Sequence, residues 1–180
     1  MNNVDAVVTF EDKWLQYKTF GQFMPRTELY NDETDILNFT RPIYKNRLSS
    51  RGSGVTWDIE RIKNSPDEWI VQESIDIQEE LRVYVIYGEI YQIGVVKQSM
   101  TEGNKAQGIS SRALMQNEIK FSTNVAKRAP SLDFAGLDIA YDSDGQLRLM
   151  EVNRSPGFAK FYELTNINLA DILYKSLNER

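Results

Sequence analysis

The chain has 180 residues, of which 41% are hydrophobic and 26% are charged, as expected of a soluble globular protein with a sizeable core. Its formal net charge of −5 argues against a nucleic-acid groove as the main surface, and the absence of histidine excludes histidine general bases, zinc–histidine sites and nucleophile–histidine pairs. Any catalysis must therefore use carboxylates, lysines, arginines, backbone donors or a bound metal. Phosphoryl transfer suits this set, because it depends on charge stabilisation and positioning.

The apolar runs and the start of the chain bear on its location. No run approaches the roughly 18 apolar residues of a membrane span. The first residues lack the basic start and the long apolar core of a secretory signal, and the chain has no cysteine. These features predict a cytoplasmic protein without a membrane partner.

The first third of the chain predicts one helix followed by short extended elements. The helix is expected over residues 12–20, ends at Gly21 ahead of Pro25, and contains Lys13. Residues 27–30 predict a strand, residues 35–39 a short helix or turn, and residues 42–48 a second strand with Lys45 near its middle. Both lysines are therefore expected on regular elements.

A segment rich in small residues, SSRGSGV, follows at residues 49–55. Its glycines and serines leave backbone N–H groups free to face a ligand, and loops of this kind cradle phosphates. It is neither a Walker loop nor a dinucleotide fingerprint, because the GK[ST] ending and the GxGxxG pattern are missing. A plain turn is the alternative, and the preceding Lys45 favours phosphate contact.

The middle of the chain predicts a helical turn over residues 58–64 and a strand, WIVQE, over residues 69–73. The strand ends at a group of acids that would ordinarily form a solvated loop: Glu73, Asp76, Glu79 and Glu80. Residues 81–87 and 90–98 then predict a hairpin that turns at Gly88 and Glu89, with Lys97 near its end. Alternation places four residues on one face of its first arm and Arg82 and Tyr84 on the other; the four are Leu81, Val83, Val85 and Tyr87.

Two further helices and one loop are expected outside the hairpins. Residues 100–111 are rich in glycine and polar residues, which predicts a mobile loop. Residues 114–129 predict a helix that ends at Pro130 and carries Phe121, Val125 and Ala129 on one stripe. Residues 168–177 predict a closing helix with four inward residues: Leu169, Ile172, Leu173 and Leu177.

A second hairpin, over residues 134–141 and 146–153, carries the strongest candidate site. If its turn at residues 142–145 closes symmetrically, Tyr141 faces Gln146 and Asp138 faces Leu149. Asp138 then shares a face with Leu147, Leu149, Glu151 and Asn153, and is a diagonal neighbour of Glu151. Diagonal side chains lie roughly 5–8 Å apart, a span that a hard divalent cation can bridge with oxygen ligands.

Two other interpretations of this hairpin are open. Asp138 and Glu151 could be solvated residues on the open face of a sheet. Alternatively, Asp142, Asp144, Gly145 and Glu151 fit four positions of a calcium-binding EF-hand loop. That pattern, however, has Ala140 where its first ligand is required, and its flanks alternate as strands.

Four segments in this order resemble the ATP-grasp superfamily: IYKNRLSSRGSGV, WIVQESI, ELRVYVIYGE and DFAGLDIAYDSDGQLRLMEVNRSPG. The last is the most specific, since it resembles the family's metal-binding GxD and ExN signature. Among relatives the chain is most similar to carboxylate–amine ligases of the RimK and glutathione-synthetase type. It lacks most of their N-terminal domain, and its spacing from Glu73 to Glu80 is shorter.

The resemblance implies a role for each group of candidate residues. The Mg²⁺ ligands, with Mn²⁺ as an alternative metal, are Asp138, Glu151 and Asn153. The ATP phosphates are held by Lys13 and Lys45 and covered by Ser49, Ser50, Arg51, Gly52, Ser53 and Gly54. The adenine-reading hinge is formed by Gln72, Glu73, Ser74 and Ile75, and the ribose is bound by Glu80. The residues that face the transferred phosphate or the acceptor carboxylate are Arg82, Lys97 and Arg154.

The resemblance also implies an α+β fold in two lobes with ATP between them. An N-terminal segment (1–25) is expected before a small lid (26–73) and a larger lobe with the metal site (74–180). The implied activity is Mg²⁺-ATP-dependent joining of a small-molecule or peptide carboxylate to an amine through an acyl phosphate. A phosphotransferase and a nucleotide-binding subunit without its own chemistry are the alternatives. A homodimer is expected, because a second subunit could complete the short N-terminal part.

Overall fold

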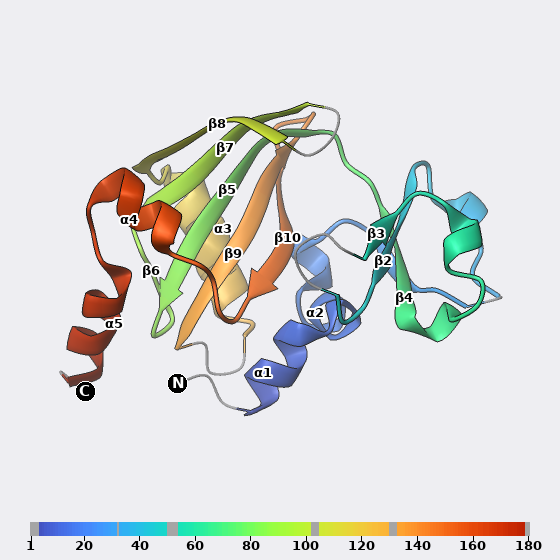
Figure 1. Cartoon of the computed structure of the whole chain (residues 1–180), viewed down its shortest axis with the longest axis horizontal. Helices are drawn as coiled ribbons and strands as arrows, with labels where there is room; N and C mark the ends of the chain where they lie inside the picture. The colour runs from blue at the N-terminus through green and yellow to red at the C-terminus, as the bar shows by residue number, and fades with distance from the viewer. Residues whose placement is uncertain (1–3, 32, 50–53, 102–104, 130–132, 179–180) are drawn as a thin grey trace.

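The structure, a computed structural model, describes residues 4–31, 33–49, 54–101, 105–129 and 133–178. Two antiparallel sheets occupy opposite ends of the molecule (Figure 1). Helix α2 (Lys13–Phe20) lies between them, directly after α1 (Val4–Glu11). The expected α+β class with antiparallel sheets and flanking helices is confirmed. None of the helices in these ranges is long and apolar enough to cross a membrane.

The smaller sheet has four strands in the order β1-β4-β2-β3. The strands are β1 (Thr27–Leu29), β2 (Pro42–Asn46), β3 (Val55–Thr56) and β4 (Trp69–Glu73). Three single turns of 3-10 helix, η2 (Ile36–Asn38), η3 (Ile59–Arg61) and η4 (Pro66–Glu68), lie between them in the chain. Tyr30, Phe39, Tyr44, Ile62 and Val71 form a separate small core here. Lys45 therefore sits on a strand with its own hydrophobic support.

The larger sheet has the order β10-β9-β5-β7-β8, with the short β6 beside β5. Its strands are β5 (Ile77–Ile86), β6 (Glu89–Ile90), β7 (Ile93–Thr101), β8 (Lys105–Ala113), β9 (Phe134–Asp142) and β10 (Leu147–Asn153). Both hairpins predicted from alternation are present, since β9 pairs with β10 and β5 pairs with β7.

The two faces of the larger sheet are covered by different helices. Leu81, Val83 and Val85 lie in the main core, which α2, η1 (Gly21–Phe23) and α3 (Gln116–Ala126) help to close. Tyr84 and Ile86, on the opposite face, pack against α4 (Ala159–Thr165) and α5 (Leu169–Asn178). Because α4 and α5 cover only one end of that second face (Figure 1), the part nearest the smaller sheet is left for a ligand site.

Several sequence predictions about the larger sheet are wrong. Residues 100–111 form the end of β7 and most of β8 in place of a loop, because pairing such as Lys97 with Ile109 satisfies their backbone groups whatever their composition. The first hairpin turns at Tyr87 and Gly88, whose φ values of 51° and 82° are left-handed. At the second turn, Tyr141 pairs with Leu147 and not with Gln146.

The helices show two further differences. Helices α1 and α4 have 8 and 7 residues, too few for a clear apolar period, and were not predicted. In α5, Leu169 is fully buried and Ile172 and Leu173 pack against it, whereas Leu177 is 55% exposed near the end of the helix. The stripe Phe121, Val125 and Ala129 does pack on the main core, although α3 itself ends at Ala126.

Candidate active site

The β9–β10 hairpin holds the predicted metal ligands, but in a different register from the one expected. Asp138 faces Glu151 directly, because a bulge between Leu149 and Glu151 inserts Met150 into β10. A bulge re-aims the side chains on either side of it. The two carboxylates are therefore direct neighbours across the ladder and not diagonal ones.

The bulge also divides the residues of β10 between two faces. Leu149 and Val152, three residues apart, are both fully buried in the main core. Met150 and Glu151 both line the cleft on the opposite face. The prediction that Leu147 and Leu149 share the face of Asp138 is wrong, since both pack in the main core. One extra residue allows an apolar strand to present a carboxylate to a ligand.

Asp138 is held by two partners in this structure. Arg82 on β5 grips it as a fork, with Nε–Oδ1 at 2.6 Å and a second nitrogen to Oδ2 at 2.7 Å. The Asn153 amide donates to Oδ2 at 2.9 Å. The hydrogen bond to Asp138 raises the pKa of Arg82. Asp138 is only 8% exposed, so the alternative of a solvated carboxylate is wrong for this residue.

The Glu151 side chain has no hydrogen-bond partner among the described residues, although it is half-buried. Burial raises the pKa of its carboxyl, Asp138 adds to the rise, and Lys13, Lys45 and Arg82 oppose it. Asp138, Glu151 and the Asn153 amide are hard oxygen donors on one patch, which fits a divalent cation with oxygen ligands. The calcium-loop alternative is wrong, because the flanks of its turn are strands β9 and β10 and not helices.

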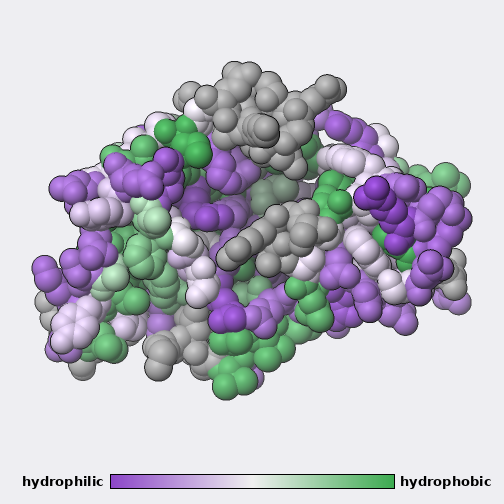
Figure 2. Space-filling model, in the orientation of Figure 1, coloured by the Kyte–Doolittle hydropathy of each residue, from purple (hydrophilic) through white to green (hydrophobic). Residues whose placement is uncertain are grey.

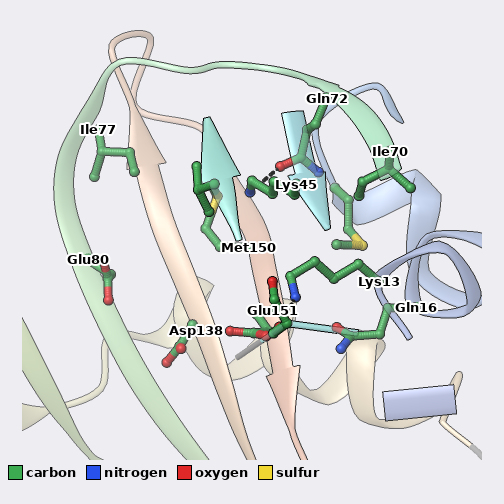
Figure 3. A pocket seen from close by; sticks show the side chains of 13 residues that line it. Lys13, Gln16, Lys45, Ile70, Gln72, Ile77, Glu80, Asp138, Met150 and Glu151 are labelled. Carbon is green, nitrogen blue, oxygen red and sulfur yellow. Dashed lines mark hydrogen bonds between the residues drawn. The ribbon is translucent and has the colours of Figure 1, made fainter. Parts of the chain in front are cut away.

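Two lysines approach Glu151 from the other side of the cleft (Figure 3). Lys45 on β2 donates to Gln72 Oε1 at 2.6 Å, and Gln72 in turn donates to Thr27 at 2.8 Å. Lys13 at the start of α2 donates to the Ser49 carbonyl. Burial lowers the pKa of both lysines, that of Lys45 to about 8. Their charges face the acidic patch without an ion pair at contact distance in the described chain.

Helix α2 is placed by contacts at its first turn. Asp12 caps it by accepting from the Trp14 N–H at 2.8 Å, and the same carboxylate pairs with Arg47, which follows β2. Burial raises the pKa of Asp12, but the bonds from Arg47 and the helix N–H groups outweigh it and leave the pKa lowered. Lys13 N–H also donates to the Arg47 carbonyl at 3.1 Å. The start of α2 is thus fastened to the smaller sheet.

Gln16, one turn further along, fastens the same helix to the metal-site strand. It is 1% exposed, accepts from the Val152 N–H at 2.8 Å and donates to the Val152 carbonyl at 3.2 Å. Because β10 is an edge strand, these backbone groups have no ladder partner on that side. Gln16 therefore sets the distance between Lys13 and the Glu151 region, a role that the sequence did not reveal.

Replacing Gln16 by Leu is expected to destabilise the protein by about 2–4 kcal/mol, because it leaves two buried backbone groups of Val152 unpaired. Chemical denaturation of both proteins measures the difference. The control is Gln116→Leu at the exposed start of α3, which should change stability by less than about 0.5 kcal/mol. Equal effects of the two substitutions would contradict the assigned role.

The cleft between the two sheets has a volume of about 230 Å³. Figure 2 shows the surface hollowed at this place, with hydrophilic residues inside the hollow. Apolar side chains that the sequence analysis did not single out form part of its wall: Met24, Val55, Ile70, Ile77 and Met150. Such a mixed lining suits a ligand with a flat apolar part and a charged part.

The predicted hinge connects the two sheets, and most of its polar groups are already engaged. Glu73 accepts from the N–H groups of Thr40 and Arg41 at 2.9 and 2.8 Å, and the Ser74 N–H donates to the Arg41 carbonyl. Within the described chain the Ile75 N–H has no hydrogen bond. Of the hinge N–H groups, that of Ile75 is the one left to meet a base.

The remaining candidates differ in how close they lie to the cleft. Glu80 lines it and pairs with Lys97, its direct partner on β7. Arg154 instead bonds to Glu11 on α1. Ser49 also lines the cleft, and Gly54 directly precedes β3. Four residues of the predicted phosphate loop lie outside the described residues: Ser50, Arg51, Gly52 and Ser53.

The fold and the site can now be set beside known families. A family of ATP-grasp domains, the third family of its clade, matches residues 29–167. This match includes Lys45, the hinge and the whole metal patch. Among curated proteins, a search by sequence finds no match.

Solved structures of ATP-grasp enzymes share the fold. The ATP-grasp ligase PsnB in complex with a minimal precursor has a TM-score of 0.72 and 21% identity, covering 97% of this chain and 64% of PsnB. D-alanine–D-alanine ligase from Bacillus anthracis has a TM-score of 0.70 and 18% identity, covering 99% of this chain and 68% of the ligase. N5-carboxyaminoimidazole ribonucleotide synthetase from Thermotoga maritima has a TM-score of 0.61 and 18% identity, with coverage of 88% and 45%. The chain thus spans less than two thirds of PsnB.

Proposed function

Since the chain belongs to the ATP-grasp domain family that matches most of its length, we propose that it uses Mg²⁺ and ATP to join a carboxylate to an amine. A carboxylate oxygen of the acceptor attacks the γ-phosphorus, and the bond from that phosphorus to the bridging oxygen of ADP breaks. The amine then attacks the acyl carbon of the resulting acyl phosphate, and phosphate leaves as the amide bond forms.

One observation carries the proposal, namely the meeting of opposite charges across the cleft. The larger sheet presents Asp138 and Glu151 as direct neighbours, and the other wall presents Lys13 and Lys45. A triphosphate with a divalent cation is a ligand that satisfies both sides at once, because its oxygens meet the lysines and its cation meets the carboxylates.

Each group has a defined task in this proposal. Asp138, Glu151 and Asn153 hold Mg²⁺, which supplies charge neutralisation to the phosphate oxygens when bound. Lys13 and Lys45 bind those oxygens from the other wall. Arg82 lies beside Asp138 and is positioned to stabilise the charge that develops on the transferred phosphoryl group, with Lys97 and Arg154 as further cations for phosphate or acceptor.

The nucleoside is proposed to lie along the hinge. Adenine would pack between Ile70 and Met150 and receive a hydrogen bond from the Ile75 N–H, beside Gln72, Glu73 and Ser74. Glu80 would accept from the ribose hydroxyls while it remains paired with Lys97. The loop from Ser49 to Gly54 would cover the phosphates. The mixed apolar and charged lining of the cleft supports this orientation.

Substrate class and assembly are part of the same proposal. PsnB has been solved with a precursor peptide and AMPPNP and with Mg and ADP, which supports ATP, Mg²⁺ and a peptide or small-molecule carboxylate as partners here. We retain the division into segment 1–25, lid 26–73 and large lobe 74–180. A homodimer that completes the acceptor site and a cytoplasmic location are likewise proposed.

Product mass tests the reaction. The protein is incubated with ATP, Mg²⁺ and pooled amino acids or peptides, and ADP and product are followed. A product lighter by one water than its two precursors supports the ligase, whereas a gain of one phosphoryl group identifies a phosphotransferase. ATP binding without turnover would favour a nucleotide-binding subunit, an alternative that the limited coverage of the solved ligases keeps relevant.

A further inference from the structure

Strand β5 carries a bulge beside the cleft. Its pairing with β9 shifts between Ile77 and Glu79, which leaves Gln78 as an extra residue. In a regular strand Ile77 and Glu80, three residues apart, would point to opposite faces of the sheet. With the extra residue in place, both line the cleft. The bulge therefore decides that Glu80 reaches the ligand.

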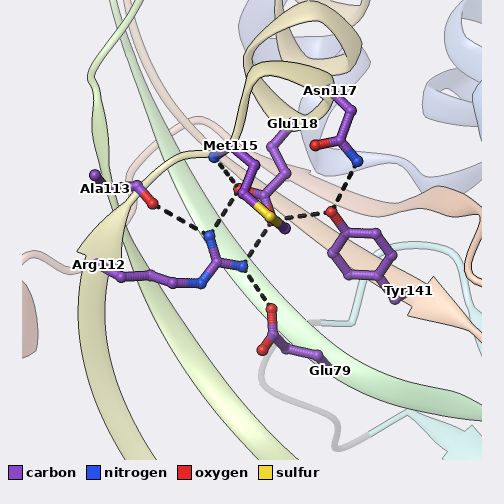
Figure 4. Close-up of polar contacts among 7 residues, drawn as sticks. All are labelled: Glu79, Arg112, Ala113, Met115, Asn117, Glu118 and Tyr141. Carbon is purple, nitrogen blue, oxygen red and sulfur yellow. Dashed lines mark hydrogen bonds and ion pairs between the residues drawn. The ribbon is translucent and has the colours of Figure 1, made fainter.

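The first residue after the bulge is held on the opposite face of the sheet (Figure 4). Glu79 pairs across the ladder with Tyr141 on β9, and both side chains point towards the start of α3. Arg112 on β8 donates to Glu79 at 2.6 Å and to the two oxygens of Glu118 at 2.7 and 2.8 Å. The Tyr141 hydroxyl donates to Glu118 at 3.0 Å. This network joins three strands to one helix.

The fixed point of this network is Glu118, which is fully buried in the first turn of α3. Besides Arg112 and Tyr141, the Met115 N–H donates to it at 2.7 Å. Burial raises the pKa of Glu118, but the bonds from Arg112 and the backbone outweigh it and leave the pKa lowered. Glu118 therefore stays charged and keeps the Arg112 guanidinium in one orientation.

A bulge needs such an anchor because the ladder is interrupted there and does not by itself fix the register. A slip of β5 by one residue would turn Glu79 towards the cleft and Glu80 away from it. Arg112 would then lose its bond to Glu79. The ion pair on one face of the sheet thus disfavours the register that would remove Glu80 from the other face.

We propose that Arg112 is a positioning residue for nucleotide recognition: by holding Glu79 it fixes the β5 bulge and thereby presents Glu80 to the ribose of the bound nucleotide. The inference rests on the proposed function, in which Glu80 accepts from the ribose hydroxyls. It adds a determinant of ribose recognition that touches no ligand. Neither Arg112 nor Glu79 lines the cleft.

Comparison of ATP with 2′,3′-dideoxy-ATP tests the proposal, because the two differ only in the ribose hydroxyls. Dissociation constants with Mg²⁺ are measured by titration calorimetry for the wild type and four variants. The wild type is expected to bind ATP roughly tenfold more tightly or better, the factor that a hydrogen bond to a charged group supplies. Glu80→Gln should reduce the ratio directly. Glu79→Ala should reduce it to a similar extent, whereas Glu79→Gln, which can still accept from Arg112, should retain most of it.

Glu89→Ala, which removes an exposed glutamate from β6 beside the same strand, is the control and should keep the wild-type ratio. A merely structural role of Glu79 would weaken both nucleotides equally and leave the ratio unchanged, which would overturn the inference while Glu80→Gln still upholds the proposed ribose site. If the wild type binds both nucleotides equally, ribose recognition by Glu80 is wrong and the inference falls with it. If neither nucleotide binds, the proposed function itself fails.

Discussion

Replacing Glu151 by Gln is expected to lower Mg²⁺-dependent ATP turnover by at least about a hundredfold, the effect typical of removing one electrostatic stabiliser from an active site. The substitution preserves the shape of the side chain and removes one of the two carboxylates proposed to hold the metal. Steady-state release of ADP at several Mg²⁺ concentrations measures the effect. Glu68→Gln, an exposed position without a side-chain hydrogen bond among the described residues, should leave turnover unchanged.

The fold should survive this substitution, because the Glu151 side chain makes no hydrogen bond within the described chain and lies beside Asp138. Its pKa is raised in the folded protein, so between the unfolded and the folded pKa the native state binds more protons. The free energy of unfolding therefore falls as the pH rises through that window, and the ionised carboxylate costs stability at neutral pH. Glu151→Gln should be as stable as the wild type without metal, or slightly more stable. If it unfolds while Asp138→Asn is silent, Glu151 is a structural residue and the metal assignment is wrong.

The sequence predicted the metal patch for a reason that was only partly correct. Periodicity placed Asp138 and Glu151 on one face, and the structure does bring them together. The expected diagonal contact assumed a regular ladder, whereas Met150 adds a bulge that brings the two residues face to face. Bulges depend on which strand lies alongside and on what anchors them, and neither is visible in the local pattern of one strand.

Alternation was reliable where one face of a strand is buried and the other is not. It assigned Leu81, Val83 and Val85 to the core and Arg82 to the opposite face. It failed at β8, whose glycine and serine residues resemble a loop although their backbone is paired with β7. The β propensity of a residue is thus a weaker determinant than the presence of a neighbouring strand.

Contacts between elements distant in the chain could not be predicted at all. Gln16 reaches Val152, 136 residues away, and Arg112 reaches Glu79 across two strands. Nothing in the spacing of these residues distinguishes them from other polar side chains on a helix or strand. Yet these residues place the lysines, the carboxylates and the bulges relative to one another. In this chain the ligand-facing groups were found by pattern, and their supporting residues required the three-dimensional arrangement.

Replacing Lys45 by Met should reduce ATP affinity and turnover by about a hundredfold or more, because it removes a cation directed at the phosphate oxygens from a partly desolvated position. Lys120→Met on the exposed side of α3 is the matched control and should have no effect on either quantity. Lys45→Arg should recover part of the affinity, since the charge returns in a larger and differently shaped group. Affinity unchanged in Lys45→Met would exclude this side of the cleft as the phosphate site.

The same residue predicts how affinity depends on pH. Burial lowers the pKa of Lys45 to about 8, so the charged form becomes scarce between pH 7 and pH 9 in the free protein. A bound triphosphate favours the charged form, and binding above pH 8 should therefore take up a proton and weaken as the pH rises. Without ligand, the unfolded lysine keeps its proton up to about pH 10, so this group makes the free energy of unfolding increase with pH between about 8 and 10. Calorimetric titrations in buffers of different ionisation enthalpy should show the proton uptake in the wild type and its loss in Lys45→Met. An equal uptake in both proteins would assign the proton to another group and remove Lys45 from the phosphate site.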